Sequence, residues 1–148
     1  MRSHILSGAF FFAVTALGYG IDAYAQKIDI PSPPVVSPAE RRVIDAGISK
    51  LRLAGERKIA RGWSPAKQVA EFICHPAALR ALKTKLNGVD RVFLGTDDQH
   101  GLDLQNDSKL LGQGQVRYEQ GWRSFSFECL IDPGTAKVTD FQASWQDR

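Results

Sequence analysis

The last part of the chain, residues 121–145, constrains the fold more than any other stretch. It contains two runs in which apolar and polar residues alternate, with a turn motif between them. Alternation with a period of two is typical of strands that bury one face. In the first run the apolar side chains share one side of the strand, and they are Phe125, Phe127, Cys129 and Ile131. The sequence therefore predicts a C-terminal β-hairpin with one buried face.

The turn motif contains Pro133 and Gly134, a pair that favours a type II turn, whose twist suits hairpins poorly. We therefore expect a longer connection of about three to five residues, or a β-bulge. Two further strands are expected at residues 89–94 and 110–119, and the polar segment 95–108 between them is expected to be a loop.

Two serine-proline pairs, at residues 37–38 and 64–65, predict helix starts, because serine caps a helix and proline suits its first turn. From the first pair, helical apolar spacing continues to Gly55 and predicts one amphipathic helix. The second helix is expected to stop at His75, because a residue before proline avoids the helical region, and a third to start at Pro76. The predicted fold class is α+β, with two to three N-terminal helices packed on a small antiparallel sheet of about four strands.

Cys74 and Cys129 are the two cysteines of the chain. A metal site would need further ligands, and a redox motif would need a shorter spacing. We expect an intramolecular disulfide that joins a helix to the sheet, with an intermolecular bond as the alternative.

The N-terminus predicts export. Arg2 precedes an uncharged apolar stretch, and Ala23 and Ala25 form a small-x-small cleavage motif. Residues 1–25 are interpreted as a signal peptide, residues 26–38 as a proline-rich flexible arm, and residues 39–148 as a single domain. The expected location is periplasmic or secreted, and a retained membrane anchor is the alternative.

Charge is unevenly distributed, although the net charge of +3 is too small to indicate nucleic-acid binding. Residues 40–62 contain seven basic and three acidic residues, whereas residues 91–148 contain six and nine. A basic helix of this kind either contacts an anionic surface such as lipid headgroups or is a solvated helix face. The candidate partners are an envelope protein, a glycan or an anionic lipid surface.

Candidate catalytic and metal-binding residues are few. Four aspartates surround His100 in a polar segment, but their spacing does not match a calcium loop; they are Asp97, Asp98, Asp103 and Asp107. The serines of the hairpin lack a nucleophile-elbow context, and His75 adjoins a cysteine expected in a disulfide. We therefore predict no catalytic residue, no metal and no cofactor.

Tryptophans are the remaining candidates for binding, because aromatic side chains stack on sugars, peptides and partner surfaces. Trp63, Trp122 and Trp145 are the three in the chain. Trp122 is out of phase with the buried phenylalanines, which is consistent with a place on the solvent side of its strand. The favoured interpretation is that it covers a helix or the end of the sheet. The predicted ligand surface comprises Trp122, Ser124, Ser126 and Glu128.

Residues of about 64–145 resemble a bacterial family of exported proteins known as domain of unknown function nine-thirty. The resemblance rests on the spacing from Gln68 to Cys74, on glycines before a strand, and on the aromatic-x-cysteine pattern at Phe127 and Cys129. This family implies no activity, cofactor or catalytic residue. The expected function is a non-catalytic binding or envelope-associated module, and the alternative is a small periplasmic hydrolase or other envelope enzyme.

Overall fold

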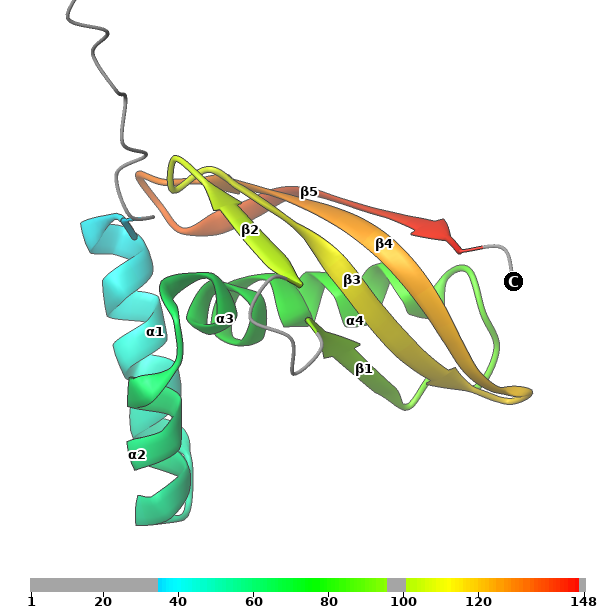
Figure 1. The fold of residues 1–148 in the computed structure, drawn as a ribbon, viewed down its shortest axis with the longest axis horizontal. Coiled ribbons are helices and arrows are strands. Elements are labelled where there is room, and N and C mark those ends of the chain that lie inside the picture. Colours follow the sequence, from blue (N-terminus) through cyan, green and yellow to red (C-terminus); the bar gives the residue numbers. More distant parts are fainter. Residues whose placement is uncertain (1–34, 96–100, 147–148) are drawn as a thin grey trace, which may run out of the picture. The chain divides into compact units, whose positions relative to one another are not determined.

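The computed structural model describes residues 35–95 and 101–146. Within these residues, helices come first in the chain and cover one face of an antiparallel sheet (Figure 1). The predicted α+β fold class is confirmed. The proposed signal peptide and most of the proline-rich arm lie outside the described residues, so those assignments stay predictions.

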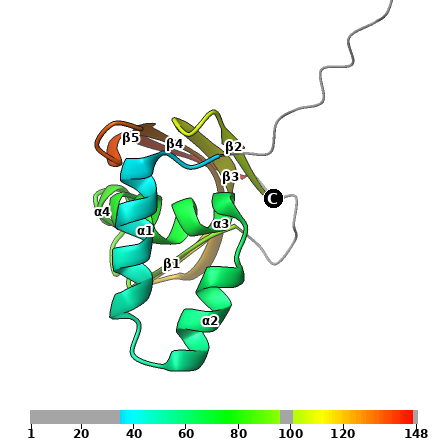
Figure 2. The ribbon, with the colours of Figure 1, turned by 90° about the vertical axis from the view of Figure 1, so that its left-hand side faces the viewer.

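The helical half consists of two helices packed side by side and a third, longer helical segment under the sheet (Figure 2). Among these described helices, none is long and apolar enough to span a membrane. The elements are α1 (Pro38–Lys50), α2 (Ala54–Gly62), α3 (Pro65–Val69), a π-helical turn (Ala70–Cys74) and α4 (His75–Lys83).

Helix α1 begins at the serine cap that the sequence predicts. The Ser37 hydroxyl accepts a hydrogen bond from the Glu40 backbone N–H at 3.2 Å, and the Glu40 carboxylate accepts one from the Ser37 N–H at 2.7 Å. The same hydroxyl donates to the backbone carbonyl of Pro133 at 2.7 Å. This cap therefore also attaches the start of α1 to the turn between the last two strands.

Replacing Glu40 by glutamine is expected to change how stability depends on pH. Burial raises the pKa of the Glu40 carboxyl above its ordinary value of 4.5, although hydrogen bonds from Ser37 oppose the rise; nearby Asp107 adds to it. The folded protein then binds more protons than the unfolded chain between the two pKa values, so this group's contribution to stability falls as pH rises through that window. Urea unfolding measures the free energy of unfolding of both proteins at about pH 4 and pH 7. The value for Glu40→Gln minus the value for wild type should be larger at pH 7 than at pH 4. A difference that is the same at both values would contradict this account.

The prediction of one helix through Gly55 is wrong, because α1 ends at Lys50 and Leu51 has an extended backbone. Arg57 donates hydrogen bonds to the carbonyls of Leu51 and Arg52, and these bonds stabilise the turn. Helix α2 folds back so that Ala60 is completely buried. The apolar spacing continues past the turn, but the chain forms a helical hairpin instead of one long helix, because the hairpin buries Ala60.

The predicted helix break at His75 is also wrong, because helical backbone continues from α3 through α4. A proline removes one backbone donor, and its ring crowds the carbonyl four residues earlier. Here the preceding turn is wider, with the His75 N–H bonded to the carbonyl of Ala70, five residues back. This π-turn accommodates Pro76 without ending the helix.

In the described part of the chain the sheet has five strands, all paired antiparallel, in the order β1-β3-β4-β5, with β2 also paired to β3. They are β1 (Arg91–Leu94), β2 (Leu102–Gln105), β3 (Lys109–Tyr118), β4 (Gly121–Asp132) and β5 (Lys137–Trp145). Strand β2 lies in the segment predicted to be a loop. It is short and polar, and it forms because one half of the long edge of β3 is free to pair with it.

The β4–β5 connection has the predicted length. Asp132 pairs with Lys137, which leaves four residues in the connection, and a register shift follows Leu130. Ala136 adopts a positive φ of 57°, whereas Gly134 does not. The hairpin therefore uses a longer turn and a bulge instead of a tight type II turn.

The core lies between the helices and the inner face of the sheet. The alternating apolar residues of β4 all face inward and are buried, as the sequence predicts. The predicted disulfide is present: Cys74 and Cys129 are bonded, with Cα atoms 6.2 Å apart, and both are fully buried. The bond joins the π-turn to β4 and is compatible with an exported protein.

Candidate functional site

The predicted ligand surface lies along β4 on the outer face of the sheet, the face turned away from the helices (Figure 1). Trp122 and Ser126 are exposed, and Ser124 and Glu128 are half-buried. Phe125 and Phe127, which alternate with them, are buried on the inner face, so pleating alone brings these four side chains to one face. We call this side of the sheet the outer face.

Trp122 lies against a second exposed aromatic residue, Phe93 of β1. Their ring centroids are 5.6 Å apart, and the ring planes are within 11° of parallel. Trp122 remains 43% exposed and Phe93 46% exposed, so about half of each side chain is open to solvent. Two large apolar rings are therefore held together on the solvent side, and we call this pair the aromatic platform.

An arginine and an aspartate border the aromatic platform. The Arg117 guanidinium lies 5.8 Å from the centre of the Trp122 ring and donates two hydrogen bonds to the Asp90 carboxylate, one of 2.8 Å. The hydrogen bond from Arg117 lowers the pKa of Asp90, and the pKa of Arg117 is raised in turn. The ion pair orients Arg117 beside the platform, where its remaining surface can contact a ligand.

Uncharged polar side chains cover the middle of the outer face. Strand pairing places glutamines of β3 opposite serines of β4, and a serine of β5 opposite Ser126. Amides and hydroxyls both donate and accept hydrogen bonds, so this area suits a ligand rich in hydroxyl and amide groups. The residues are Gln113, Gln115, Ser124, Ser126 and Ser144. Beyond them, Lys109 and Glu128 form an ion pair of 2.8 Å.

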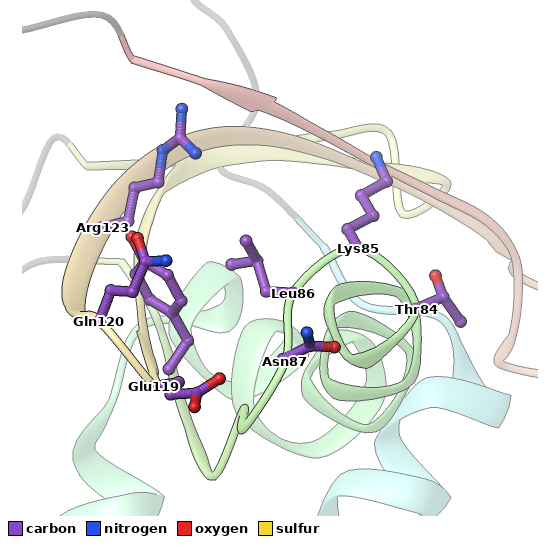
Figure 3. Close-up of a pocket in the computed structure, with 8 residues that line it drawn as sticks. Thr84, Lys85, Leu86, Asn87, Glu119, Gln120 and Arg123 are labelled. Atoms are coloured by element: carbon purple, nitrogen blue, oxygen red, sulfur yellow. The ribbon is translucent and has the colours of Figure 1, made fainter.

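A separate polar pocket of about 280 Å³ opens where the end of α4 meets the β3–β4 turn (Figure 3). Sequence reasoning missed it, because its residues come from segments far apart in the chain. Arg123 lies 4.4 Å over the Trp145 ring, and the Lys85 ammonium donates to the Ala143 carbonyl at 3.3 Å. Both cations already contact β5: Lys85 joins the end of α4 to this strand, and Arg123 joins β4 to it.

The other two tryptophans have packing roles. Trp63 is half-buried, with its ring 6.1 Å from that of Phe72, and Trp145 meets Phe125 edge to face at 6.4 Å. Of the three tryptophans, Trp122 is the exposed one. The alternating pattern of each strand already separates the two: Trp122 is out of step with the buried residues of β4, whereas Trp145 is in step with the apolar residues of β5.

The residues considered for catalysis are not brought together in the part of the chain that the structure describes. The His75 imidazole Nε2 lies 3.1 Å from the Val92 carbonyl, which connects α4 to β1. Asp103 is exposed on β2 and accepts a hydrogen bond from Gln105. Asp97, Asp98 and His100 lie outside the described residues. Within residues 35–95 and 101–146, no group of three or more His, Cys, Asp or Glu side chains could hold a metal ion.

Comparison of the chain with protein-family models, with curated proteins and with solved structures gave no match.

Proposed function

We propose that this protein is a non-catalytic binding module of the bacterial envelope that holds a glycan chain on the outer face of its sheet. In this proposal residues 1–25 direct export to the periplasm and the arm comprises residues 26–34. The expected end of the arm at residue 38 is wrong, because Val36 and Ser37 are buried and Pro38 begins α1. The resemblance to domain of unknown function nine-thirty, for which no family model matched, stays part of this proposal and adds no activity. The buried disulfide is consistent with an oxidising compartment.

The aromatic platform is the observation that carries this proposal. Exposing Phe93 and Trp122 forfeits the favourable free energy of burying two large apolar side chains. The faces of aromatic rings carry partial negative charge, and the C–H bonds of a sugar ring are weakly positive, so sugars stack on such faces. Arg117 and Asp90 at the side of the platform supply charged hydrogen-bonding groups for sugar hydroxyls.

The polar area next to the platform favours a chain over a single sugar. It extends across β3 and β4, with Gln115 opposite Ser124 and Gln113 opposite Ser126. Sugar units beyond the one on the platform would meet these amides and hydroxyls in turn. A β-linked chain fits best, because its extended form can cross neighbouring strands and present its ring faces to the sheet. Amide side chains also pair with acetamido groups, which points to N-acetylated sugars.

Replacing Trp122 by alanine is expected to weaken glycan binding by about tenfold or more, because a central aromatic residue carries much of the affinity of such a site. The measurement is isothermal titration calorimetry with chitotetraose, a soluble oligomer of β-linked N-acetylglucosamine. The matched control is Ile59→Ala, which truncates an exposed apolar side chain on α2 and should leave affinity unchanged. Wild-type affinity in Trp122→Ala would refute the proposed site, and equal binding of maltotetraose, an α-linked oligomer, would refute the preference for β-linked chains.

The alternative function, a small periplasmic hydrolase, is tested with the same oligosaccharide. Prolonged incubation followed by chromatography should return intact chitotetraose if the protein only binds it. Shorter products would replace the binding module with the enzyme. The polar pocket beside Tyr118 and Glu119 would then be the first place to look for the catalytic groups.

A further inference from the structure

The helical hairpin formed by α1 and α2 exposes apolar side chains. Six large apolar side chains are exposed in the described residues, and two of them form the aromatic platform. Of the other four, Leu53 and Ile59 lie just before and within α2, Val43 lies in α1, and Val35 precedes α1 at its end away from the turn. Leu53 is 63% exposed and Ile59 is 62% exposed. Single exposed apolar residues are common on protein surfaces, so these exposures gain meaning only from their surroundings.

Those surroundings are strongly basic. Residues 50–61 contain five basic residues and one acidic residue. Four of the five are exposed, namely Lys50, Arg52, Lys58 and Arg61. The acidic residue, Glu56, accepts a hydrogen bond from the Leu53 backbone N–H at 3.3 Å and so caps α2. The chain from residue 91 to its end has more acidic than basic residues, so the positive charge is not spread evenly and the hairpin carries much of it.

The turn of the hairpin lies at its end farthest from the sheet in both views (Figure 1, Figure 2). Leu53 immediately precedes α2 in this turn, next to the exposed Arg52. Arg57 bonds the carbonyls of Leu51 and Arg52, which holds the turn in shape. The tip therefore presents an exposed apolar side chain next to the exposed Arg52, with further exposed cations in the last turn of α1 and along α2. The sheet does not obstruct the approach of the tip to a flat surface.

We propose that the tip of the helical hairpin docks on an anionic lipid bilayer surface. Apolar side chains enter the boundary between headgroups and acyl chains, while lysine and arginine contact the anionic headgroups. A nucleic acid would satisfy the cations, but it would leave Leu53 without a partner. This inference is independent of glycan binding, because it uses the opposite part of the domain and none of the outer-face residues.

The test is co-sedimentation of the exported protein with vesicles that contain phosphatidylglycerol, compared with vesicles of phosphatidylcholine alone. Binding is expected for the anionic vesicles only, and raised salt should weaken it. Leu53→Asp is expected to reduce partitioning by at least about tenfold. The combined variant Arg52→Gln, Lys58→Gln and Arg61→Gln is expected to reduce it by about a hundredfold, since each basic residue near the surface contributes about fivefold.

Controls separate this result from misfolding and from the proposed function. The changed side chains are exposed, so circular dichroism of the variants should match wild type. Leu53 is the N-cap residue of α2, and aspartate is a better cap than leucine, so Leu53→Asp should melt no lower than wild type. Trp122→Ala should bind vesicles normally, even though it is expected to lose glycan. Equal binding to neutral vesicles, or wild-type binding by Leu53→Asp and by the charge-neutral variant, would overturn the proposal. Concentration-dependent dimerisation that Leu53→Asp abolishes, without any vesicle binding, would assign the tip to a second copy of the chain and also overturn it.

Discussion

The Cys129→Ser protein is expected to unfold with a free energy about 2–5 kcal/mol lower than wild type. The Cys74–Cys129 bond spans 55 residues, and loss of this cross-link gives the unfolded chain more conformational freedom, by about 4 kcal/mol in the chain-entropy model. The new hydroxyl would also sit in a fully buried position. Guanidinium unfolding of the oxidised proteins measures the loss.

The Cys74→Ser protein and the double serine variant are the matched controls, because all three lack the same bond. The double variant also lacks a free thiol that could pair between molecules. All three should lose stability by similar amounts, and wild type treated with reductant should approach them. An unchanged melting temperature for Cys129→Ser under oxidising conditions would contradict a structural role for this bond.

Phe125→Ala is expected to lower the free energy of unfolding by about 3–5 kcal/mol. Phe125 is fully buried at the centre of β4, and its ring meets those of Phe127 and Trp145 at 6.2 and 6.4 Å. It also occupies the space above Gly114, where an added Cβ would lie 2.6 Å from the ring. Truncation leaves a cavity that these neighbours cannot fill without moving.

Phe93→Ala makes the same chemical change on the outer face and serves as the comparison. Phe93 is about half exposed, so its truncation should cost about 1 kcal/mol. Urea unfolding of both variants therefore separates the buried face of the sheet from its solvent face. Equal losses would mean that the inner and outer faces had been assigned incorrectly.

Much of the sheet could be predicted from the local alternation of apolar residues. The disulfide could be predicted from two cysteines in a chain whose N-terminus predicts export. Period-two alternation in residues 121–145 is a direct consequence of burying one face, so it gives both the strands and their orientation. The helix boundaries were harder, because long-range contacts determine them. The buried Gln68 amide donates to the Ala60 carbonyl at 3.0 Å and accepts from Arg41, which joins three helices that local spacing does not relate.

In the candidate site, too, local pattern predicts one residue and long-range contacts determine its neighbours. The phase of Trp122 relative to Phe125 predicts its place on the outer face, but its partner Phe93 is 29 residues away in sequence. Only the pairing of β1 with β3, and of β3 with β4, brings the two rings together. The same pairing places Arg117 beside Trp122, and Arg117 in turn bonds Asp90, which lies next to β1. Such neighbours follow from strand register, which depends on pairing across the whole sheet.

Nuclear magnetic resonance titration of the ¹⁵N-labelled protein with chitotetraose tests the central claim most directly. The Trp122 indole N–H and the backbone amides of Phe93, Gln115 and Ser124 should shift progressively with ligand. The indole of Trp145 and the amides of α2 should stay in place, because they lie away from the outer face. Shifts confined to the pocket around Lys85 and Arg123, or no shifts at any ligand concentration, would contradict a glycan site on the outer face.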